Sequence, residues 1–202
     1  MKIIGLCGGS GSGKGTVSSI FGEIGIPSVD ADKIYHRITS DDSECLRALS
    51  VRFGSDIVGA DGALDRHRLG KIVFTGDGAE RNREDLNRIS HKYVLEEIRA
   101  ECEQHRKKGA EAVVVDAPLL FESGYHRECD TVIAVIADRD IRIRRIVSRD
   151  KITTEAAEAR INAQLSDKYL RENSQFTIVN DGGLDTLRER VFEIAEKILN
   201  KN

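Results

Sequence analysis

A lysine and several glycines near the N-terminus have the spacing of a polyphosphate-binding loop. Gly8 and Gly13 are separated by four residues, and Lys14 follows directly. Glycine lacks the Cβ that would keep a backbone from curling around an anion, so successive N–H groups can point at phosphate oxygens. The Lys14 ammonium is then placed to reach the β- and γ-phosphates of ATP. The pattern predicts an ATP site formed by Gly9, Ser10, Gly11, Ser12, Gly13, Lys14, Gly15 and Thr16.

The residue after the lysine departs from the usual pattern, in which a Ser or Thr hydroxyl binds Mg²⁺. Gly15 stands at that position, and the hydroxyl comes one residue later, at Thr16. A second candidate ligand is Asp116, which ends the apolar run 112–116 as the acid of a Walker B strand does. We expect Mg²⁺ as the cofactor, held by Asp116 through water, with Thr16 as the other candidate ligand.

Two carboxylates, Asp30 and Asp32, lie at the end of a short predicted strand at residues 27–30. We expect Asp30 to cap a helix and Asp32 to act in catalysis, because the carboxyl ends of parallel strands face the ligand crevice. Arg37 follows five residues later and could face the same cleft. His67 and His91 are more simply interpreted as solvent-touching histidines.

Arginines crowd one predicted helix between the last two strands. Arg142, Arg145 and Arg149 share one stripe at helical spacing, and an apolar stripe lies beside it. A charged stripe is ordinarily a solvated face. Here Asp140 is the only acid among five arginines, so we favour phosphate binding. The polar segment 151–173 that follows, with a helix starting near Thr153, predicts a lid.

The elements that must position these groups alternate between strands and helices. Apolar runs predict a strand before the loop and further strands at 27–30, 112–116, 131–136 and 177–179; helices are expected at 14–23 and 184–199. This alternation predicts an α/β fold, a doubly wound parallel five-stranded sheet of P-loop NTPase type. Residues 34–108 show only helical patterns, at 43–53, 65–73, 80–89 and 91–107, which indicates an inserted helical substrate lobe.

We therefore expect a single domain of P-loop type over residues 1–202. Its core comprises 1–32, 110–138 and 174–202, its helical lobe 33–109 and its lid 139–173.

Composition narrows the class of protein. The 202 residues carry a formal net charge of -3, which argues against a general nucleic-acid or membrane-surface role. No segment approaches the ~20 apolar residues of a membrane span, and the first strand begins directly after Met1, leaving no room for a signal peptide. The four cysteines are widely scattered and show no metal-binding spacing, as in reduced structural thiols. We expect a cytoplasmic protein that binds neither nucleic acid nor membrane.

The motifs together resemble the dephospho-CoA kinase family. The resemblance rests on the loop at 5–16, the VDAD segment at 29–32, the DAPLLFE segment at 116–122, Arg149-Asp150, and the later Arg160 and Gln164. It implies transfer of the γ-phosphate of ATP to the 3′-hydroxyl of the ribose of dephospho-CoA, the last step of CoA synthesis. ATP and dephospho-CoA are the implied partners, and the oligomeric state stays open.

The resemblance also implies roles for individual residues. Asp32 would accept the hydroxyl proton, while Lys14 and Arg149 would act on the phosphoryl group. The ATP site would further include Arg145, Asn180 and Gly183, and the substrate site Asp32, Arg37, His91, Leu119 and Phe121. The family usually reads Asp-Asn in the segment that frames adenine, whereas this chain reads Asn180-Asp181.

Two alternatives stay open from the residues alone. Another small-molecule kinase of the nucleoside-monophosphate type would share the loop and the lid arginines, and it would explain the GKGT order more naturally. A non-catalytic, nucleotide-gated binding module is a second, although Asp32, Lys14 and Arg149 together speak against it. A panel of acceptors with labelled ATP separates these possibilities.

Overall fold

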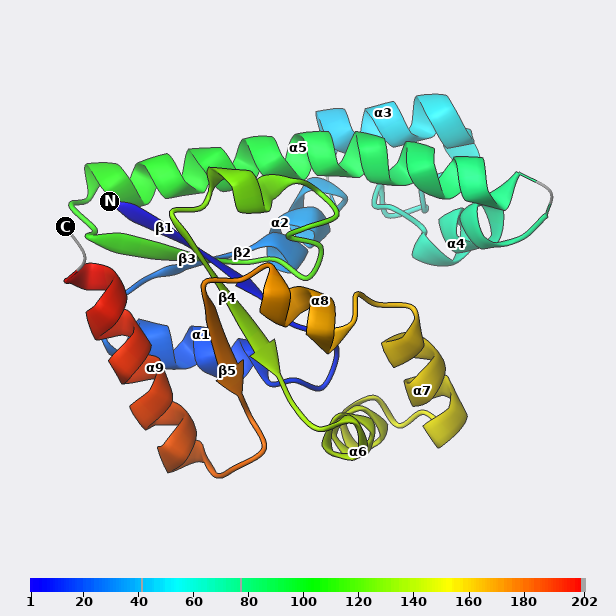
Figure 1. Ribbon diagram of the computed structural model, residues 1–202. Coiled ribbons are helices and arrows are strands. Elements are labelled where there is room, and N and C mark those ends of the chain that lie inside the picture. The colour runs from blue at the N-terminus through cyan, green and yellow to red at the C-terminus, as the bar shows by residue number, and fades with distance from the viewer. Residues whose placement is uncertain (41, 77, 201–202) are drawn as a thin grey trace. The chain divides into compact units, whose positions relative to one another are not determined.

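A five-stranded sheet lies at the centre of the fold (Figure 1). The computed structural model describes residues 1–40, 42–76 and 78–200. The strand order is β2-β3-β1-β4-β5, and β1 pairs in parallel with β3 and β4, as β4 does with β5. The strands are β1 (Lys2–Cys7), β2 (Ser28–Asp30), β3 (Ala112–Asp116), β4 (Thr131–Ile136) and β5 (Phe176–Val179). The predicted α/β fold with a five-stranded parallel sheet is confirmed.

Helices follow the strands in the expected alternation. They are α1 (Lys14–Glu23), α2 (Ala31–Ile38), α3 (Glu44–Phe53), α4 (Arg66–Phe74), α5 (Ala79–Lys107), α6 (Arg139–Asp150), α7 (Thr154–Asn162), α8 (Asp167–Glu172) and α9 (Leu184–Leu199). Short 3₁₀ turns are η1 (Ser55–Ile57) and η2 (Tyr125–Glu128). Among the described residues, none of these helices combines the length and the apolar character that crossing a membrane requires.

The main core lies between the sheet and two helices. Ile4 and Leu6 of β1 are fully buried and belong to one cluster with Phe21 of α1 and Val191 of α9. Both helices therefore cover the same face of the sheet. Because β1 is the central strand, the loop that follows it emerges between the ends of β3 and β4, where a parallel sheet places its ligands.

The chain divides into two compact units, residues 1–29 with 102–202, and residues 30–101. The second unit overlaps the predicted helical lobe 33–109 up to residue 101, whereas 102–109 fall in the first unit. It has its own apolar cluster, which includes Leu46, Leu49, Ile57 and Leu69. The lid segment 139–173 falls in the first unit, where Ile143 and Ile146 of α6 pack with Ala157 and Ile161 of α7. The predicted core segment 174–202 ends with two residues that lie outside the described part of the chain, and the predicted lobe includes two more, 41 and 77.

The predicted helix break near residue 90 is wrong. Helix α5 runs without interruption from Ala79 to Lys107, through Ser90 and His91. The interval contains neither glycine nor proline, and a single serine costs a helix only about 0.5 kcal/mol relative to alanine. The polar pair at 90–91 was therefore too weak a signal to end a helix. The other predicted termini at Glu23, Thr153 and Leu199 are confirmed, with Thr153 capping α7.

The cysteines are free thiols. Cys7 in β1 and Cys45 in α3 are each 1% exposed. Burial raises the pKa of each of these two thiols to about 11, because the thiolate would lose its hydration. The expectation of reduced structural cysteines fits this environment.

Candidate active site

The glycine-rich loop passes directly from β1 into α1. Gly13 caps α1 in the left-handed region, with φ 93°, and Lys14 is the first helical residue. The first N–H groups of a helix have no acceptor within the helix, so this turn presents donors to an anion. The predicted loop and helix are thus present as one continuous element.

Lys14 forms an ion pair with Asp116. Their side chains are 16% and 10% exposed, respectively. The pairing of Leu6 with Asp116 in the β1–β3 register brings the ends of these two strands to the same level, which explains how residues so distant in sequence meet. The two predicted phosphate and metal groups are therefore adjacent.

Two of the predicted ATP-binding residues brace the loop through its carbonyl groups. The Asn180 side chain, in a residue only 7% exposed, donates from Nδ2 to the Ser12 carbonyl at 2.8 Å. Arg145 donates to the Gly11 carbonyl at 3.2 Å and to the Asn180 carbonyl at 3.1 Å. These contacts fix the backbone of the loop from the protein side.

The neighbouring residues of that segment have different partners. Asp181 accepts a hydrogen bond from the Asp138 N–H at 2.6 Å. Gly183 is the N-cap residue of α9, three positions beyond Asn180.

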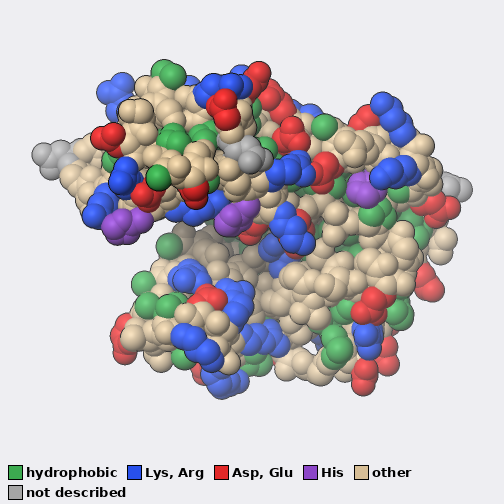
Figure 2. Space-filling view, turned by 180° about the vertical axis from the view of Figure 1, so that it is seen from behind, with side chains coloured by type: hydrophobic (Ala, Val, Ile, Leu, Met, Phe, Trp, Pro, Cys, Tyr) green, Lys and Arg blue, Asp and Glu red, His purple; other side chains and the backbone are tan. Residues whose placement is uncertain are grey.

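The arginines of the predicted stripe differ in their surroundings. Arg142 is buried and bonded to the loop, whereas Arg149 is exposed and has both Nε and Nη2 bonded to Asp150, at 2.7 and 3.0 Å. Asp150 also pairs with Arg160. The Arg149 guanidinium, followed by that of Arg160, lowers the pKa of Asp150 to about 2. Figure 2 shows Lys and Arg side chains gathered over α6 and α7, at the lower left of that view.

A small cavity opens beside the loop in the first unit. It is lined by Gly8 and Gly9, by Leu119 and Glu122 of the segment after β3, and by Gln164 and Leu170 of the lid segment. Burial raises the pKa of the Glu122 carboxyl. Of the two predicted substrate residues here, Leu119 is 46% exposed on this wall.

The other predicted substrate residue of this segment, Phe121, is 9% exposed. Its ring packs against His126 and Tyr169, at centroid distances of 4.8 and 5.6 Å. Phe121 is therefore mostly engaged in packing within the protein.

The second unit carries the remaining predicted residues. Asp30 caps α2, as expected, by accepting from the Lys33 N–H at 3.0 Å. Asp32 lies in the first turn of the same helix and is exposed, with no ion-pair partner within the described ranges. Arg37 instead pairs with Glu97 and Glu101, both at 2.8 Å. This arrangement satisfies its guanidinium within the helical unit.

His91 is half-buried, and its Nε2 has no hydrogen-bond partner among the described residues. Burial lowers its pKa.

The donor set fits Mg²⁺ that arrives with a nucleotide. Asp116 supplies one carboxylate, Thr16 is an exposed hydroxyl in the first turn of α1, and Gly15 supplies none. The described residues contain no group of three or more His, Cys, Asp or Glu side chains that could hold a metal. Mg²⁺ commonly keeps several waters and binds through one or two carboxylates and substrate phosphates. The site is therefore suited to Mg·ATP.

Sequence reasoning assigned no role to three residues that contact the predicted ones. Asp150 holds Arg149, and Gln164 and Asp167 bond Arg142. Asp150 and Gln164 stood in the motifs that carried the family resemblance, and that was the available signal. Nothing in the pattern around Asp167 distinguishes it from an ordinary first-turn acid.

Comparisons with known proteins match nearly the whole chain. A family model described as dephospho-CoA kinase matches residues 2–186. A dephospho-CoA kinase of Symbiobacterium thermophilum is 40% identical over 191 residues, covering 95% of this chain and 79% of the relative. A dephospho-CoA kinase of Geobacillus kaustophilus is 38% identical over 196 residues, covering 96% of this chain and 95% of the relative. The crystal structure of TT1252 from Thermus thermophilus matches with a TM-score of 0.79 and 28% identity, over 98% of this chain and 97% of that one. The chain therefore belongs to the dephospho-CoA kinase family.

Proposed function

We propose that the chain transfers the γ-phosphate of ATP to the 3′-hydroxyl of the ribose of dephospho-CoA and releases CoA and ADP. Family membership gives the substrate class. The observation that carries the reaction type is the braced loop with Lys14 and Asp116 paired at the ends of adjacent strands. Phosphoryl transfer asks a protein mainly to position groups and neutralise charge, and this arrangement supplies both.

Lys14 and the N–H groups at the start of α1 hold the β- and γ-phosphates. The side chain of Lys14 is only 16% exposed, so its charge acts with little screening by water. When ATP binds, its phosphates compete with Asp116 for the ammonium. Asp116 would then hold Mg²⁺ through water, and the ion would supply positive charge to the phosphates.

Asp32 is the proposed general base. Its exposed carboxylate lies in the first turn of α2, two residues after β2 ends, and within the described residues no cation neutralises it. We expect Asp32→Asn to lower kcat roughly 10²- to 10⁴-fold while ADP binding changes little, as for loss of a general base. Lys33→Gln, an exposed neighbour, is the matched control. Turnover of Asp32→Asn near that of the unaltered chain would refute the role.

Arg149 is the proposed arginine for the transferring phosphoryl group. Asp150 holds it in the arrangement described above, so Arg149 must exchange a carboxylate for a phosphate when it acts. A carboxylate and a phosphate each present a pair of oxygens that can accept two parallel hydrogen bonds from a guanidinium. Asp150 would thus hold the Arg149 guanidinium between turnovers.

The deciding experiment is ATP-dependent conversion of dephospho-CoA, followed by ³¹P NMR for the new 3′-phosphate and for ADP. AMP and shikimate serve as competing acceptors. We expect CoA and ADP to form in equal amounts with dephospho-CoA, and much slower transfer to the other two. Phosphorylation of AMP with dephospho-CoA left unchanged would instead support a nucleoside-monophosphate kinase.

A further inference from the structure

Arg142 is a buried arginine whose partners are all protein groups. It is 4% exposed. Its Nε donates to the Ser10 carbonyl at 2.9 Å, Nη1 to Asp167 Oδ1 at 2.9 Å, and Nη2 to Gln164 Oε1 at 3.2 Å. A buried guanidinium is costly unless its donors are satisfied, and here each of its three nitrogens has an acceptor. Three of the five N–H donors of Arg142 are therefore committed to protein acceptors, which differs from the phosphate-binding role expected from the stripe.

Gln164 completes a closed set of bonds around Ser10. Its Oε1 accepts from the Ser10 N–H at 2.9 Å, and its Nε2 donates to Ser10 Oγ at 3.3 Å. The peptide groups on both sides of Ser10 are thus held by side chains from α6 and from the segment after α7. Side chains of the protein thus bind the loop to the lid segment.

The glycines of the loop match this packing. A Cβ at Gly9 would lie 2.2 Å from Arg142 Nη2, and one at Gly11 would lie 2.6 Å from the Arg142 carbonyl oxygen. Gly9 does not have the positive φ that would require glycine, whereas Gly11 has φ 77°. The Arg142 guanidinium therefore takes most of the space that a Cβ at position 9 would need, with Gln164 Oε1 at 3.0 Å as the next neighbour.

We infer that Arg142 is a positioning residue that sets the path of loop residues 9–11 and thereby the nucleotide affinity of the enzyme. Through Asp167 and Gln164, the same residue makes that affinity depend on the α7–α8 connection. The inference goes beyond the acceptor substrate, because it concerns only the phosphate loop and can be tested with ADP alone.

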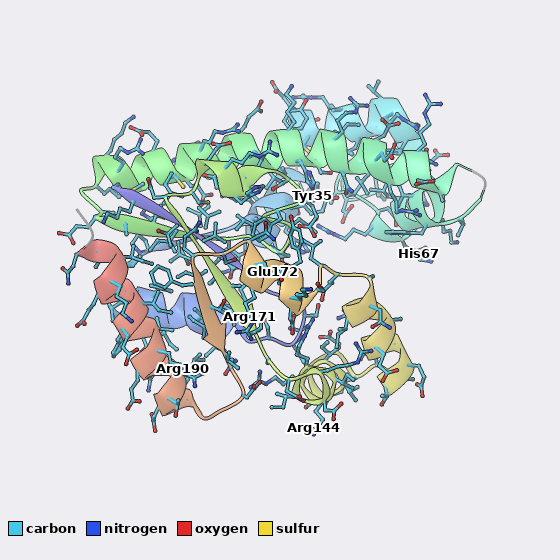
Figure 3. The ribbon with its side chains drawn as sticks, in the orientation of Figure 1. Tyr35, His67, Arg144, Arg171, Glu172 and Arg190 are labelled. Carbon is cyan, nitrogen blue, oxygen red and sulfur yellow. The ribbon has the colours of Figure 1, made fainter. Side chains whose placement is uncertain are left out.

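The first test compares Arg142→Gln with Arg144→Gln. Arg144 is an exposed arginine of the same helix, on the side away from the sheet in Figure 3. Calorimetric titration with ADP should give a Kd about tenfold higher for Arg142→Gln and unchanged for Arg144→Gln, since a charge-assisted hydrogen bond to the loop is lost only in the former. In turnover, the KM for ATP should rise more than kcat falls. A purely structural role would lower the unfolding temperature and leave the Kd of the folded protein within twofold, which would overturn the inference.

Asp167→Ala provides a milder perturbation in case Arg142→Gln does not fold. Asp167 is 35% exposed and touches Arg142 but not the loop. Its matched control is Asp185→Ala, an exposed first-turn acid of α9. The ADP Kd should rise about threefold for Asp167→Ala only, by loss of part of the coupling. Equal Kd values for the two variants would contradict the dependence on the α7–α8 connection.

The last test asks whether position 9 responds to Arg142 specifically. Gly9→Ala should raise the ADP Kd about tenfold in the unaltered chain but less than about threefold in an Arg142→Ala background, because the side chain that blocks the new methyl is gone. Gly22→Ala, at a helical glycine with nothing within 4 Å of the added Cβ, is the control. Equal effects of Gly9→Ala in both backgrounds would overturn the assignment.

Discussion

Asn180 links the last strand to the phosphate loop, and its removal should cost stability and nucleotide affinity together. Asn180→Ala removes the 2.8 Å bond to Ser12 and leaves that buried carbonyl without its donor. An unsatisfied buried acceptor costs about 1–3 kcal/mol. With about 2 kcal/mol lost, the folding equilibrium changes about 30-fold and the unfolding temperature falls by about 4–8 °C for a chain of this length.

Asn180→Asp should be worse than Asn180→Ala, although it keeps the size of the side chain. The carboxylate would set an acceptor against the Ser12 carbonyl oxygen, where Nδ2 now donates. Urea unfolding of the three proteins measures the order. Asn173→Ala is the control, since Asn173 is exposed and its side chain donates to the Tyr169 carbonyl of its own turn at 2.9 Å.

The same variants separate a loop brace from a base-contacting residue. Because the Asn180 amide faces the loop, Asn180→Ala should lower kcat/KM for ATP and for GTP by similar factors and leave their ratio within about twofold. A change of more than about twofold in the ratio of kcat/KM for ATP to kcat/KM for GTP would refute this reasoning. It would place the amide on the nucleotide base, as the family resemblance implies.

Three further predictions concern the loop and the lid. Arg149→Lys should lower kcat more than it raises KM, since an ammonium cannot reproduce the bidentate fork; full activity would make the arginine only a solvated charge. Gly15→Ser fits without a clash, because nothing lies within 4 Å of the added Cβ. The new hydroxyl should reduce the Mg²⁺ concentration that gives a half-maximal rate at fixed ATP. Identical Mg²⁺ titrations of the two proteins would show that another group already fills that coordination position. Asp150 should titrate at about 2 by carboxyl ¹³C NMR and move toward 3.8 in Arg149→Gln. Because the fold lowers this pKa, its pairing stabilises the lid above pH 4 and is lost as the pH falls through about 2; a native titration near 3.8 would contradict the pairing.

The fold was largely predictable because its signals are local. The apolar runs of β1, β3 and β4 are buried strands, and Thr153 and Asp30 cap the helices expected of them. The predicted helix break at Ser90 was wrong because it rested on a weak local signal, a short polar pair. Helix α5 continues through that pair over its full length from Ala79 to Lys107.

The hydrogen-bond partners of the site residues could not be predicted from local sequence signals. Asn180 and Ser12 are 168 positions apart, and only the completed sheet brings them together. Helical periodicity placed Arg142 and Arg145 on one stripe, but Arg142 is buried whereas Arg145 is partly exposed. A charge pattern on a helix therefore indicated the correct side of α6 without showing which arginine would be buried.

The buried thiols of Cys7 and Cys45 can report local opening of the structure around them. A thiol with a pKa of about 11 and 1% exposure reacts with an alkylating reagent only after the structure around it opens. Cys7 lies in the unit that contains the sheet and Cys45 in the helical unit. Single-cysteine versions that retain one or the other would give separate alkylation rates for the two units. Addition of ADP would then show which unit the nucleotide stabilises, without any label being introduced.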